Sequence, residues 1–340
     1  MELNHGGDWA GFREKYGKLP LDFSASTTPL PMPEGMRAAV IRSLDRANRY
    51  PDPLCRELTA VLGEKHNVSP AHILCGAGAA DLLFRLVLAK RPRRALIVEP
   101  TFSGYEDALR TVNCRVERFF LREKDGFTLT EGLLPHITPG LDMLFLCSPN
   151  NPTGRSVPTE LLEDIRERCR QRGTLPVLDA CFGDFLPGPP QDGPFVLRSF
   201  TKRYPMAGLR LGYAVCPDIE LLEEMRRQGP PWAVSAPAQA AGLAALEEQA
   251  YSRELAALIS EQRPVLSAGL ETLGCRVIPG EANFLLFFCP DTDLNRKLEE
   301  KGILIRNCSN FPGLGSGWYR AAVRTGEENQ ALLRAMKEAL

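Results

Sequence analysis

Short apolar runs alternate with amphipathic segments over the first two thirds of the chain. The apolar runs have the length of β-strands and occupy residues 73–75, 95–98, 143–147 and 175–178. Segments with helical periodicity occupy residues 34–44, 54–66, 81–89, 105–112, 159–171 and 235–248. Because the crossovers between parallel strands are usually helices, this alternation predicts an α/β fold with a large, mostly parallel sheet covered by helices.

The pattern changes at both ends of the chain. Residues 1–35 are rich in Pro, and they predict an irregular N-terminal arm without a helix. Near the other end, residues 251–273 predict a helix long enough to bridge two domains. Strands are predicted after it at 276–278, 283–289, 303–306 and 318–323, and helices at 294–301 and 327–340. We therefore expect a large domain (36–250) and a small α+β domain (251–340), with the arm (1–35) packing near the small domain.

Composition agrees with this organisation and excludes some classes of partner. The 340 residues exceed the roughly 250–300 that one hydrophobic core usually serves. A net charge of -1 argues against nucleic acid or an anionic membrane as the main partner. No apolar run approaches the ~20 residues of a spanning helix, and the N-terminus lacks an export-signal pattern. The ten cysteines are scattered without a C-x-x-C pair, so we expect reduced core residues of a cytoplasmic protein, without disulfides or a metal site.

A lysine-bearing turn lies between two apolar segments at residues 195–215. Ser199 and Thr201 place hydroxyl groups beside Lys202, and Arg210 adds a cation eight residues later. A lysine in a partly dry pocket next to another cation loses proton affinity and becomes an amine nucleophile, as a Schiff base to an aldehyde cofactor requires. Ser199 and Arg210 are suited to a phosphate. The alternative is a surface loop with scattered charges, which the short S-x-x-K motif alone does not exclude.

A glycine turn follows the first predicted strand and precedes a helix, at Gly76-Ala-Gly-Ala-Ala80. Free backbone N–H groups and the helix dipole make such a turn an anion site. The turn is not G-x-G-x-x-G, so we prefer a single phosphate to a dinucleotide. Close packing of the helix on the strand is the alternative explanation.

Polar and aromatic groups follow the ends of the other predicted strands, where α/β sheets bind ligands. Asp179 ends a wholly apolar strand and needs a cationic partner, which a protonated pyridine nitrogen would supply. A helix cap or a structural ion pair would satisfy it too. Phe102 could stack on a flat heteroaromatic ring or belong to the core. Asn151 could donate its amide N–H to a phenolic oxygen or serve only the turn.

Two further cations and a histidine lie near the ends of the chain. Arg320 and Arg324 flank the predicted strand 321–323 and could clamp a carboxylate or a phosphate, or lie at a solvated strand end. His5 starts the arm, and a solvated tail is its simplest interpretation.

In their order and spacing these motifs resemble the fold-type-I pyridoxal-phosphate enzymes, in the branch of the histidinol-phosphate aminotransferases. The resemblance covers essentially the whole chain and rests on Gly76-Ala-Gly, Pro100-Thr-Phe, Ser148-Pro-Asn-Asn-Pro-Thr-Gly, Asp179-x-x-Phe, Ser199-Phe-Thr-Lys and Gly208-Leu-Arg-Leu-Gly-Tyr. Other stretches resemble the L-threonine-O-3-phosphate decarboxylases of cobalamin biosynthesis. These stretches are His5-Gly-Gly, Leu21-Asp-Phe-Ser-Ala, Arg49-Tyr-Pro-Asp, the Met225-Arg-Arg-Gln and Pro231-Trp232 region, Ile303-Leu-Ile-Arg-Asn-Cys-Ser-Asn-Phe-Pro-Gly and Tyr319-Arg-Ala-Ala-Val-Arg.

The resemblance implies pyridoxal 5'-phosphate (PLP) as the cofactor and a role for each motif. Lys202 would carry the cofactor and later return a proton, and Asp179 would keep the pyridine nitrogen protonated so that the ring is an electron sink. Phe102 would stack on the ring and Asn151 would contact its O3′. The cofactor phosphate would be held by Gly78, Ala79, Ser199 and Arg210. Tyr50 would reach the cofactor phosphate of a partner subunit, which implies a homodimer with shared sites.

The resemblance also implies a substrate site. Arg320 occupies the family's position for the substrate carboxylate, and the candidates for the rest of the substrate, including its phosphate, are His5, Arg306, Asn310 and Arg324. Two positions depart from the family. Phe182 stands where many relatives have a Tyr that donates to O3′, and Ala180 stands where Glu is frequent. Either change could retune the cofactor or the pocket without abolishing the chemistry.

Decarboxylation and transamination share their first step, and the bond to Cα that stands perpendicular to the ring decides between them. The second cation Arg324 and the His5 arm favour a small, doubly anionic substrate. We therefore expect decarboxylation of L-threonine O-3-phosphate to (R)-1-amino-2-propanol O-2-phosphate. A histidinol-phosphate aminotransferase is the alternative on the same fold, and a non-catalytic binding protein is the alternative from another class.

Overall fold

A seven-stranded sheet forms the centre of the larger part of the molecule. The structure is a computed structural model, and it describes residues 5–188 and 191–340. The strands are β2 (Ile73–Gly76), β3 (Arg94–Glu99), β4 (Arg115–Phe120), β5 (Met143–Cys147), β6 (Leu175–Asp179), β7 (Val196–Ser199) and β8 (Gly212–Val215), in the order β2-β8-β7-β6-β5-β3-β4. β8 runs antiparallel to the other six strands, which are parallel to one another. The predicted mostly parallel sheet is confirmed.

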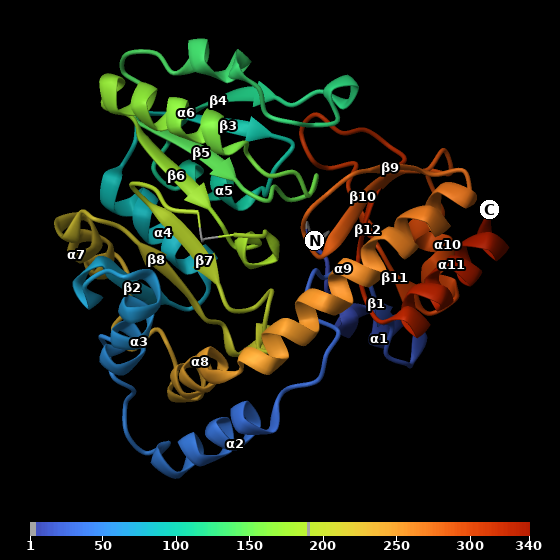
Figure 1. Cartoon of the computed structure of the whole chain (residues 1–340), viewed down its shortest axis with the longest axis horizontal. Coiled ribbons are helices and arrows are strands. Elements are labelled where there is room, and N and C mark those ends of the chain that lie inside the picture. The colour runs from blue at the N-terminus through green and yellow to red at the C-terminus, as the bar shows by residue number, and fades with distance from the viewer. Residues whose placement is uncertain (1–4, 189–190) are drawn as a thin grey trace.

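Alternate residues of the central strands pack against helices on opposite faces of this sheet. Leu144 and Leu146 of β5 belong to a core that includes α6 (Thr159–Arg172). Met143 and Phe145 belong to a second core. The helices of that second core are α4 (Ala79–Lys90), α5 (Gly104–Arg110) and α7 (Ile219–Arg227). Because both faces are covered, the central strands β3, β5 and β6 are mostly apolar, which is the reason that the sequence predicts them well (Figure 1).

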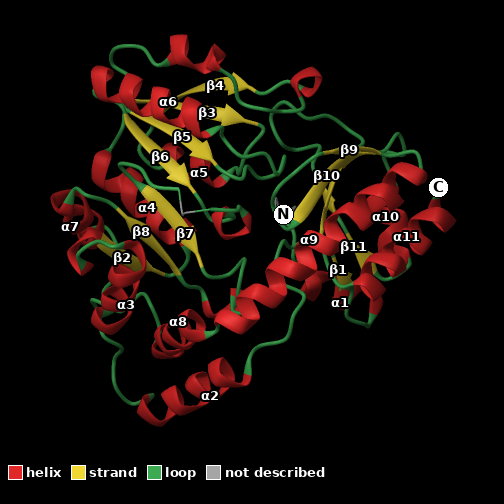
Figure 2. Ribbon diagram, viewed as in Figure 1, coloured by secondary structure: helices red, strands yellow, loops and turns green. Residues whose placement is uncertain are grey.

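The smaller part of the molecule contains an antiparallel sheet of order β12-β13-β10-β9. Its strands are β9 (Arg276–Ile278), β10 (Phe284–Phe288), β12 (Arg306–Asn307) and β13 (Trp318–Ala322). Helices α10 (Leu294–Glu300) and α11 (Gly326–Ala339) belong to this part, and α9 (Gln249–Thr272) runs from the larger part to it (Figure 2). The division at residues 35 and 250 stays a prediction.

The strand predicted at 303–306 is two strands in the structure. Ile303 and Leu304 form β11, which pairs with β1 (Leu21–Asp22) of the arm, whereas Arg306 pairs with Arg320 of β13. The arm also hydrogen-bonds to the small sheet, because the N–H of Ala322 donates to the carbonyl of Phe23 at 2.8 Å. The arm is therefore held against β11 and β13 of the smaller part of the molecule.

Two helices correct the sequence-based expectations. The arm was expected to lack a helix, but Trp9–Tyr16 form α1, which is capped by Asp8 and anchored by the buried side chain of Phe12. Helix α7, whose first turn is capped by Asp218, was not predicted either. One buried anchor residue is enough for α1 because the strand that follows it, β1, is held by its pairing with β11.

The remaining helices complete the larger part of the molecule. They are α2 (Glu34–Ser43), α3 (Arg56–His66) and α8 (Ala236–Glu247), with short 3-10 helices at Leu44–Arg46, Pro70–His72, Glu123–Asp125, Glu131–His136, Gly183–Phe185 and Ala207–Leu209. No helix among the described residues has the length and apolarity needed to cross a membrane.

Candidate active site

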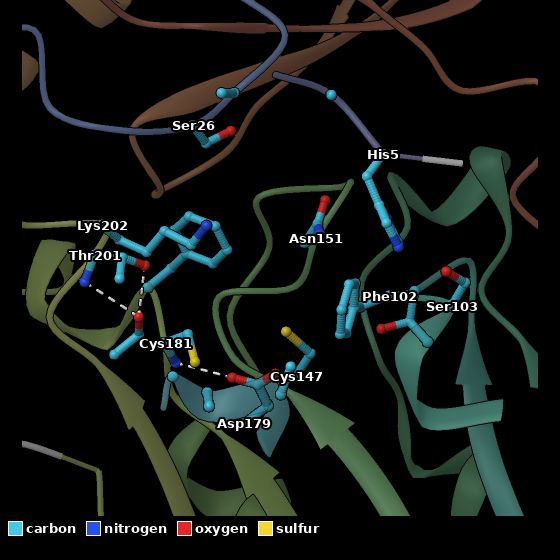
Figure 3. Close-up of a pocket in the computed structure, with 18 of the residues that line it drawn as sticks. His5, Ser26, Phe102, Ser103, Cys147, Asn151, Asp179, Cys181, Thr201 and Lys202 are labelled. Carbon is cyan, nitrogen blue, oxygen red and sulfur yellow. Dashed lines mark hydrogen bonds between the residues drawn. The ribbon is translucent and has the colours of Figure 1, made fainter. Parts of the chain in front are cut away.

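A cavity of about 420 Å³ lies where the arm, the strand ends of the large sheet and the small sheet meet. Most of the residues predicted for the site line it: His5, Gly78, Ala79, Phe102, Asn151, Asp179, Ser199, Lys202, Arg210, Arg306, Asn310 and Arg320. Figure 3 shows Lys202 and Phe102 on opposite sides of this space, with Asp179 at its base. Two predicted residues, Tyr50 and Arg324, do not line it.

Lys202 reaches the cavity from the turn that follows β7. Burial lowers the pKa of its amine, and the nearby cations Arg320 and Arg210 lower the pKa further, against the opposing effects of Cys181 and Asp179. Its Nζ lies 5.4 Å from the centre of the Phe182 ring. A lysine amine with a lowered pKa is a better nucleophile near neutral pH, as the sequence analysis expected. The second apolar segment around this turn becomes a strand only at Gly212, because Arg210 takes a left-handed conformation with φ 61°.

The turn between β2 and α4 forms a cradle for an anion. Gly78 has φ 92°, and a Cβ there would lie 2.8 Å from Nη2 of Arg210. The hydroxyl groups of Ser199, the last residue of β7, and of Thr201 are 2.8 Å apart. The cradle therefore offers several hydrogen-bond donors that suit a phosphate: the backbone N–H groups at the start of α4, two hydroxyls and a guanidinium.

Asp179 is buried at the end of β6 and has two hydrogen-bond donors. Its Oδ2 accepts a hydrogen bond from the hydroxyl of Tyr105 at 2.6 Å, and its Oδ1 accepts one from the N–H of Cys181 at 3.0 Å. No cation among the described residues forms an ion pair with it. A buried carboxylate without a cation fits a protonated ring nitrogen.

Phe102 lines the cavity on the side away from Lys202, and Asn151 lies between these two residues in Figure 3. The Phe102 ring meets the edge of the Tyr105 ring at 5.6 Å and lies 5.7 Å from the His5 ring, between centroids. Asn151 accepts a hydrogen bond from Arg320 through Oδ1, so its Nδ2 is the atom that can donate to a ligand. This orientation agrees with the predicted contact to a phenolic oxygen.

Arg320 is a buried cation at the end of the cavity that the small sheet and the arm form. Its Nη2 donates to the carbonyl of Ser24 at 2.8 Å, and its Nε has no hydrogen-bond partner. No carboxylate among the described residues forms an ion pair with it, and burial lowers its pKa to about 10. Arg306, which donates to Asn310 at 2.9 Å, and His5 complete this end. Burial and the charges of Arg306 and Arg320 lower the pKa of His5. The arrangement favours an anionic ligand.

Arg324 and Tyr50 lie outside the cavity. The guanidinium of Arg324 forms an ion pair with Glu328 at 2.8 Å and donates to the carbonyl of Asp22 at 3.1 Å, so it ties α11 to the arm. This corrects its expected place beside Arg320: β13 ends at Ala322, so strand geometry no longer fixes the direction of Arg324, and Glu328 and the arm hold its guanidinium instead. Tyr50 is 78% exposed and stacks on Trp232 with centroids 4.4 Å apart.

The two departures from the family pattern are buried. Phe182 packs edge-on against Phe284 at 5.0 Å and brings no hydroxyl to the cavity, whereas Ala180 belongs to the core under α6. Of positions 151 and 182, only Asn151 offers a hydrogen-bond donor to the cavity, whereas a Tyr at position 182 would offer a second one.

Two residues of the cavity region were missed by sequence reasoning. Ser26 lines the cavity with a buried hydroxyl that has no hydrogen-bond partner, and Tyr105 holds Asp179 from beneath Phe102. Ser26 lies in the irregular arm, whose path the sequence does not predict. The spacing of three residues between Phe102 and Tyr105 at the start of a helix was the only available signal for Tyr105.

Taken together, the amine of Lys202, the carboxylate of Asp179 and the anion cradle fit a pyridine aldehyde that carries a phosphate. The sequence model for aminotransferase class I and II matches residues 20–336. The chain belongs to this family. Class I and II aminotransferases depend on pyridoxal 5'-phosphate, so PLP is the cofactor of this protein. The predicted resemblance and fold class are confirmed.

Other family members differ in how closely they match. The threonine-phosphate decarboxylase of Salmonella typhimurium is 41% identical over 99% of this chain and 96% of its own length. The histidinol-phosphate aminotransferase of Methanosarcina mazei is 32% identical over 95% of this chain and 89% of its own length. Among solved structures, the L-threonine-O-3-phosphate decarboxylase of Porphyromonas gingivalis superposes with a TM-score of 0.81, at 25% identity over 93% of this chain and 98% of that one.

Proposed function

We propose that this protein is a PLP-dependent lyase that decarboxylates L-threonine O-3-phosphate to (R)-1-amino-2-propanol O-2-phosphate and CO₂, in the synthesis of the aminopropanol linker of cobalamin. The observation that carries the proposal is the charge of the cavity. Among the described residues that line it, Asp179 is the only carboxylate, whereas the substrate end holds the cations Arg306 and Arg320 and the imidazole of His5. Such an end suits a small substrate with two anionic groups. The 41% identity to a threonine-phosphate decarboxylase over nearly the whole chain agrees with this choice.

The residues divide between cofactor and substrate. When bound, PLP supplies an electron sink that stabilises negative charge at the substrate Cα. Lys202 would bind its aldehyde, Asp179 its ring nitrogen, and Asn151 its ring oxygen through Nδ2. Phe102 would pack on the ring. The phosphate would be held by Gly78, Ala79, Ser199 and Arg210.

Arg320 is the proposed carboxylate ligand. Its hydrogen bonds to Ser24 and Asn151 fix the guanidinium, so a bound carboxylate has one preferred orientation. Decarboxylation breaks the bond between Cα and this carboxylate, CO₂ leaves, and Cα takes up one proton. Lys202 lines the same cavity and, when its amine is protonated, can deliver that proton. Arg306, Asn310 and His5 are proposed to hold the substrate phosphate, and Arg324 is not included.

The test compares two reactions of the purified, PLP-loaded enzyme. L-Threonine O-3-phosphate is supplied and CO₂ is measured, while histidinol phosphate with 2-oxoglutarate is supplied in parallel and glutamate is measured. We expect CO₂ in the first and no glutamate in the second. Glutamate without CO₂ would contradict the proposal and identify a histidinol-phosphate aminotransferase.

We also propose a cytoplasmic homodimer with shared sites. The exposed stack of Tyr50 on Trp232 supports a protein contact there, because two large aromatic rings on a free surface are unfavourable. Tyr50 would then reach the cofactor phosphate of the partner. If sites are shared, mixing inactive Tyr50→Ala and Lys202→Ala proteins should restore activity, because each hybrid dimer contains one site with both residues intact. Two separately inactive proteins that stay inactive after verified exchange of subunits would contradict shared sites.

A further inference from the structure

The hydroxyl of Tyr105 lies under the cavity and contacts the carboxylate of Asp179. Tyr105 belongs to α5 and is 1% exposed. The 2.6 Å distance from its Oη to Oδ2 of Asp179 is that of a charge-assisted O–H···O⁻ hydrogen bond. Burial, followed by the charge of Asp179, raises the pKa of Tyr105 well above its usual value. The phenol therefore keeps its proton over the whole working pH range and always acts as the donor.

The ring of Tyr105 is held independently of this hydroxyl. It stacks on Phe145 of β5, with centroids 5.3 Å apart and planes at 19°, and its edge meets Phe102 at 5.6 Å. Phe102 is the ring proposed to pack on the cofactor. One side chain thus braces the stacking ring with its own ring and the carboxylate with its hydroxyl.

We propose that Tyr105 is a positioning residue that acts through Asp179 to keep the proton of the bound cofactor on its ring nitrogen. A donor on Oδ2 stabilises the carboxylate form, and therefore the pair in which the ring nitrogen is protonated rather than the pair in which Asp179 holds the proton. The donors on the two oxygens, Tyr105 and the N–H of Cys181, also limit rotation of the carboxylate about its last torsion, which is otherwise broad. Stabilisation of the carboxylate and restriction of its rotation both favour a protonated ring nitrogen.

The Tyr105→Phe variant removes the hydroxyl and keeps the two ring contacts. Tyr213→Phe is the matched control, because Tyr213 is also a buried tyrosine of this part of the molecule, bonds to a side chain (His66, 2.9 Å) and does not line the cavity. Cofactor bearing a ¹⁵N label in the ring is bound to each protein without substrate. We expect the ¹⁵N signal of Tyr105→Phe to shift toward that of unprotonated pyridine, and its PLP dissociation constant to rise about tenfold or more, whereas Tyr213→Phe matches the wild type.

A double-mutant cycle distinguishes action through Asp179 from simple packing. If Tyr105 acts through Asp179, removing its hydroxyl in an Asp179→Asn background should cost much less PLP affinity than it costs in the wild type. Equal losses in both backgrounds, or an unchanged ¹⁵N signal in Tyr105→Phe, would overturn the proposal. A thermal midpoint for apo Tyr105→Phe far below that of apo Tyr213→Phe would overturn it too, in favour of a structural role. The experiment uses the cofactor alone, so its result does not depend on which substrate the enzyme accepts.

Discussion

The guanidinium of Arg320 donates to Ser24 and Asn151, but no carboxylate among the described residues neutralises it. Replacement by Met removes the proposed carboxylate ligand. We expect the affinity for L-threonine O-3-phosphate to fall about 100-fold, since a charge-assisted pair in a partly dry site contributes about 3 kcal/mol. Binding of 1-amino-2-propanol O-2-phosphate, which has no carboxylate, should change much less. Both affinities can be measured from the change in cofactor absorbance on titration.

Arg324→Met provides the matched control for this experiment. Arg324 is four residues away, and its partners are Glu328 and the arm rather than the cavity. The substitution Arg324→Met should lower the free energy of unfolding and leave substrate affinity near the wild-type value. A loss of substrate affinity as large as that of Arg320→Met would return Arg324 to the substrate site.

Glu99 is a buried carboxyl at the end of β3, and burial raises its pKa to about 7. The unfolded value is roughly 4.3, so the folded protein binds the proton more tightly. The stabilisation from this proton is fully present below pH ~4 and is lost as pH rises through about 7, with an upper limit of about 4 kcal/mol. Denaturation by urea at several pH values should show that Glu99→Gln loses less stability than the wild type between pH ~5 and ~8. Parallel pH profiles of the two proteins would contradict the shifted pKa.

At the scale of elements, the turn between β2 and α4 depends on Gly78. Its φ of 92° with ψ 164° lies in a region that is essentially restricted to glycine, and a Cβ would contact Arg210. Gly78→Ala should therefore displace the guanidinium and weaken PLP binding about tenfold, for a cost of about 1–3 kcal/mol. Equilibrium dialysis of PLP measures this directly.

Gly17→Ala separates backbone strain from displacement of Arg210. Gly17 ends α1 with φ 70°, and a Cβ there meets nothing within 4 Å. The substitution Gly17→Ala should cost about 1 kcal/mol of local stability and leave PLP binding unchanged. If Gly78→Ala binds PLP as the wild type does, the proposed phosphate cradle is wrong.

The elements that sequence predicts best are those whose burial is uniform. β5 is buried along its whole length, and its apolar run identified it. α1 escaped prediction because a single buried residue, Phe12, anchors it and no apolar stripe is needed. The split of residues 303–306 into β11 and β12 also escaped, because it depends on two different partner strands that are distant in sequence. Patterns along the chain do not contain such pairings.

At the scale of the molecule, the cavity exists because three distant segments converge. Arg320 of the small sheet hydrogen-bonds to Ser24 of the arm and to Asn151 in the turn after β5, at sequence separations of 296 and 169 residues. Motifs at strand ends predicted the large-sheet side of this site, since the ends of parallel strands share one edge. The places of Ser26 and Tyr105, and the exclusion of Arg324, depend on packing between segments, for which motifs give no information.

The meeting of these three segments also gathers cations around the cavity, in a protein whose net charge is only -1. Arg306, Arg320 and Arg210 line one cavity, and their combined field should draw a phosphorylated substrate toward it. Salt screens such a field, because the Debye length falls from about 30 Å at 0.01 M to about 3 Å at 1 M. We therefore expect kcat/KM for L-threonine O-3-phosphate to fall as NaCl is raised across this range, and more steeply than kcat/KM for unphosphorylated L-threonine. Steady-state assays of both compounds at fixed pH measure the two slopes. Equal slopes would mean that the cavity does not attract the phosphate through its charge, and the assignment of Arg306 to that group would have to be abandoned.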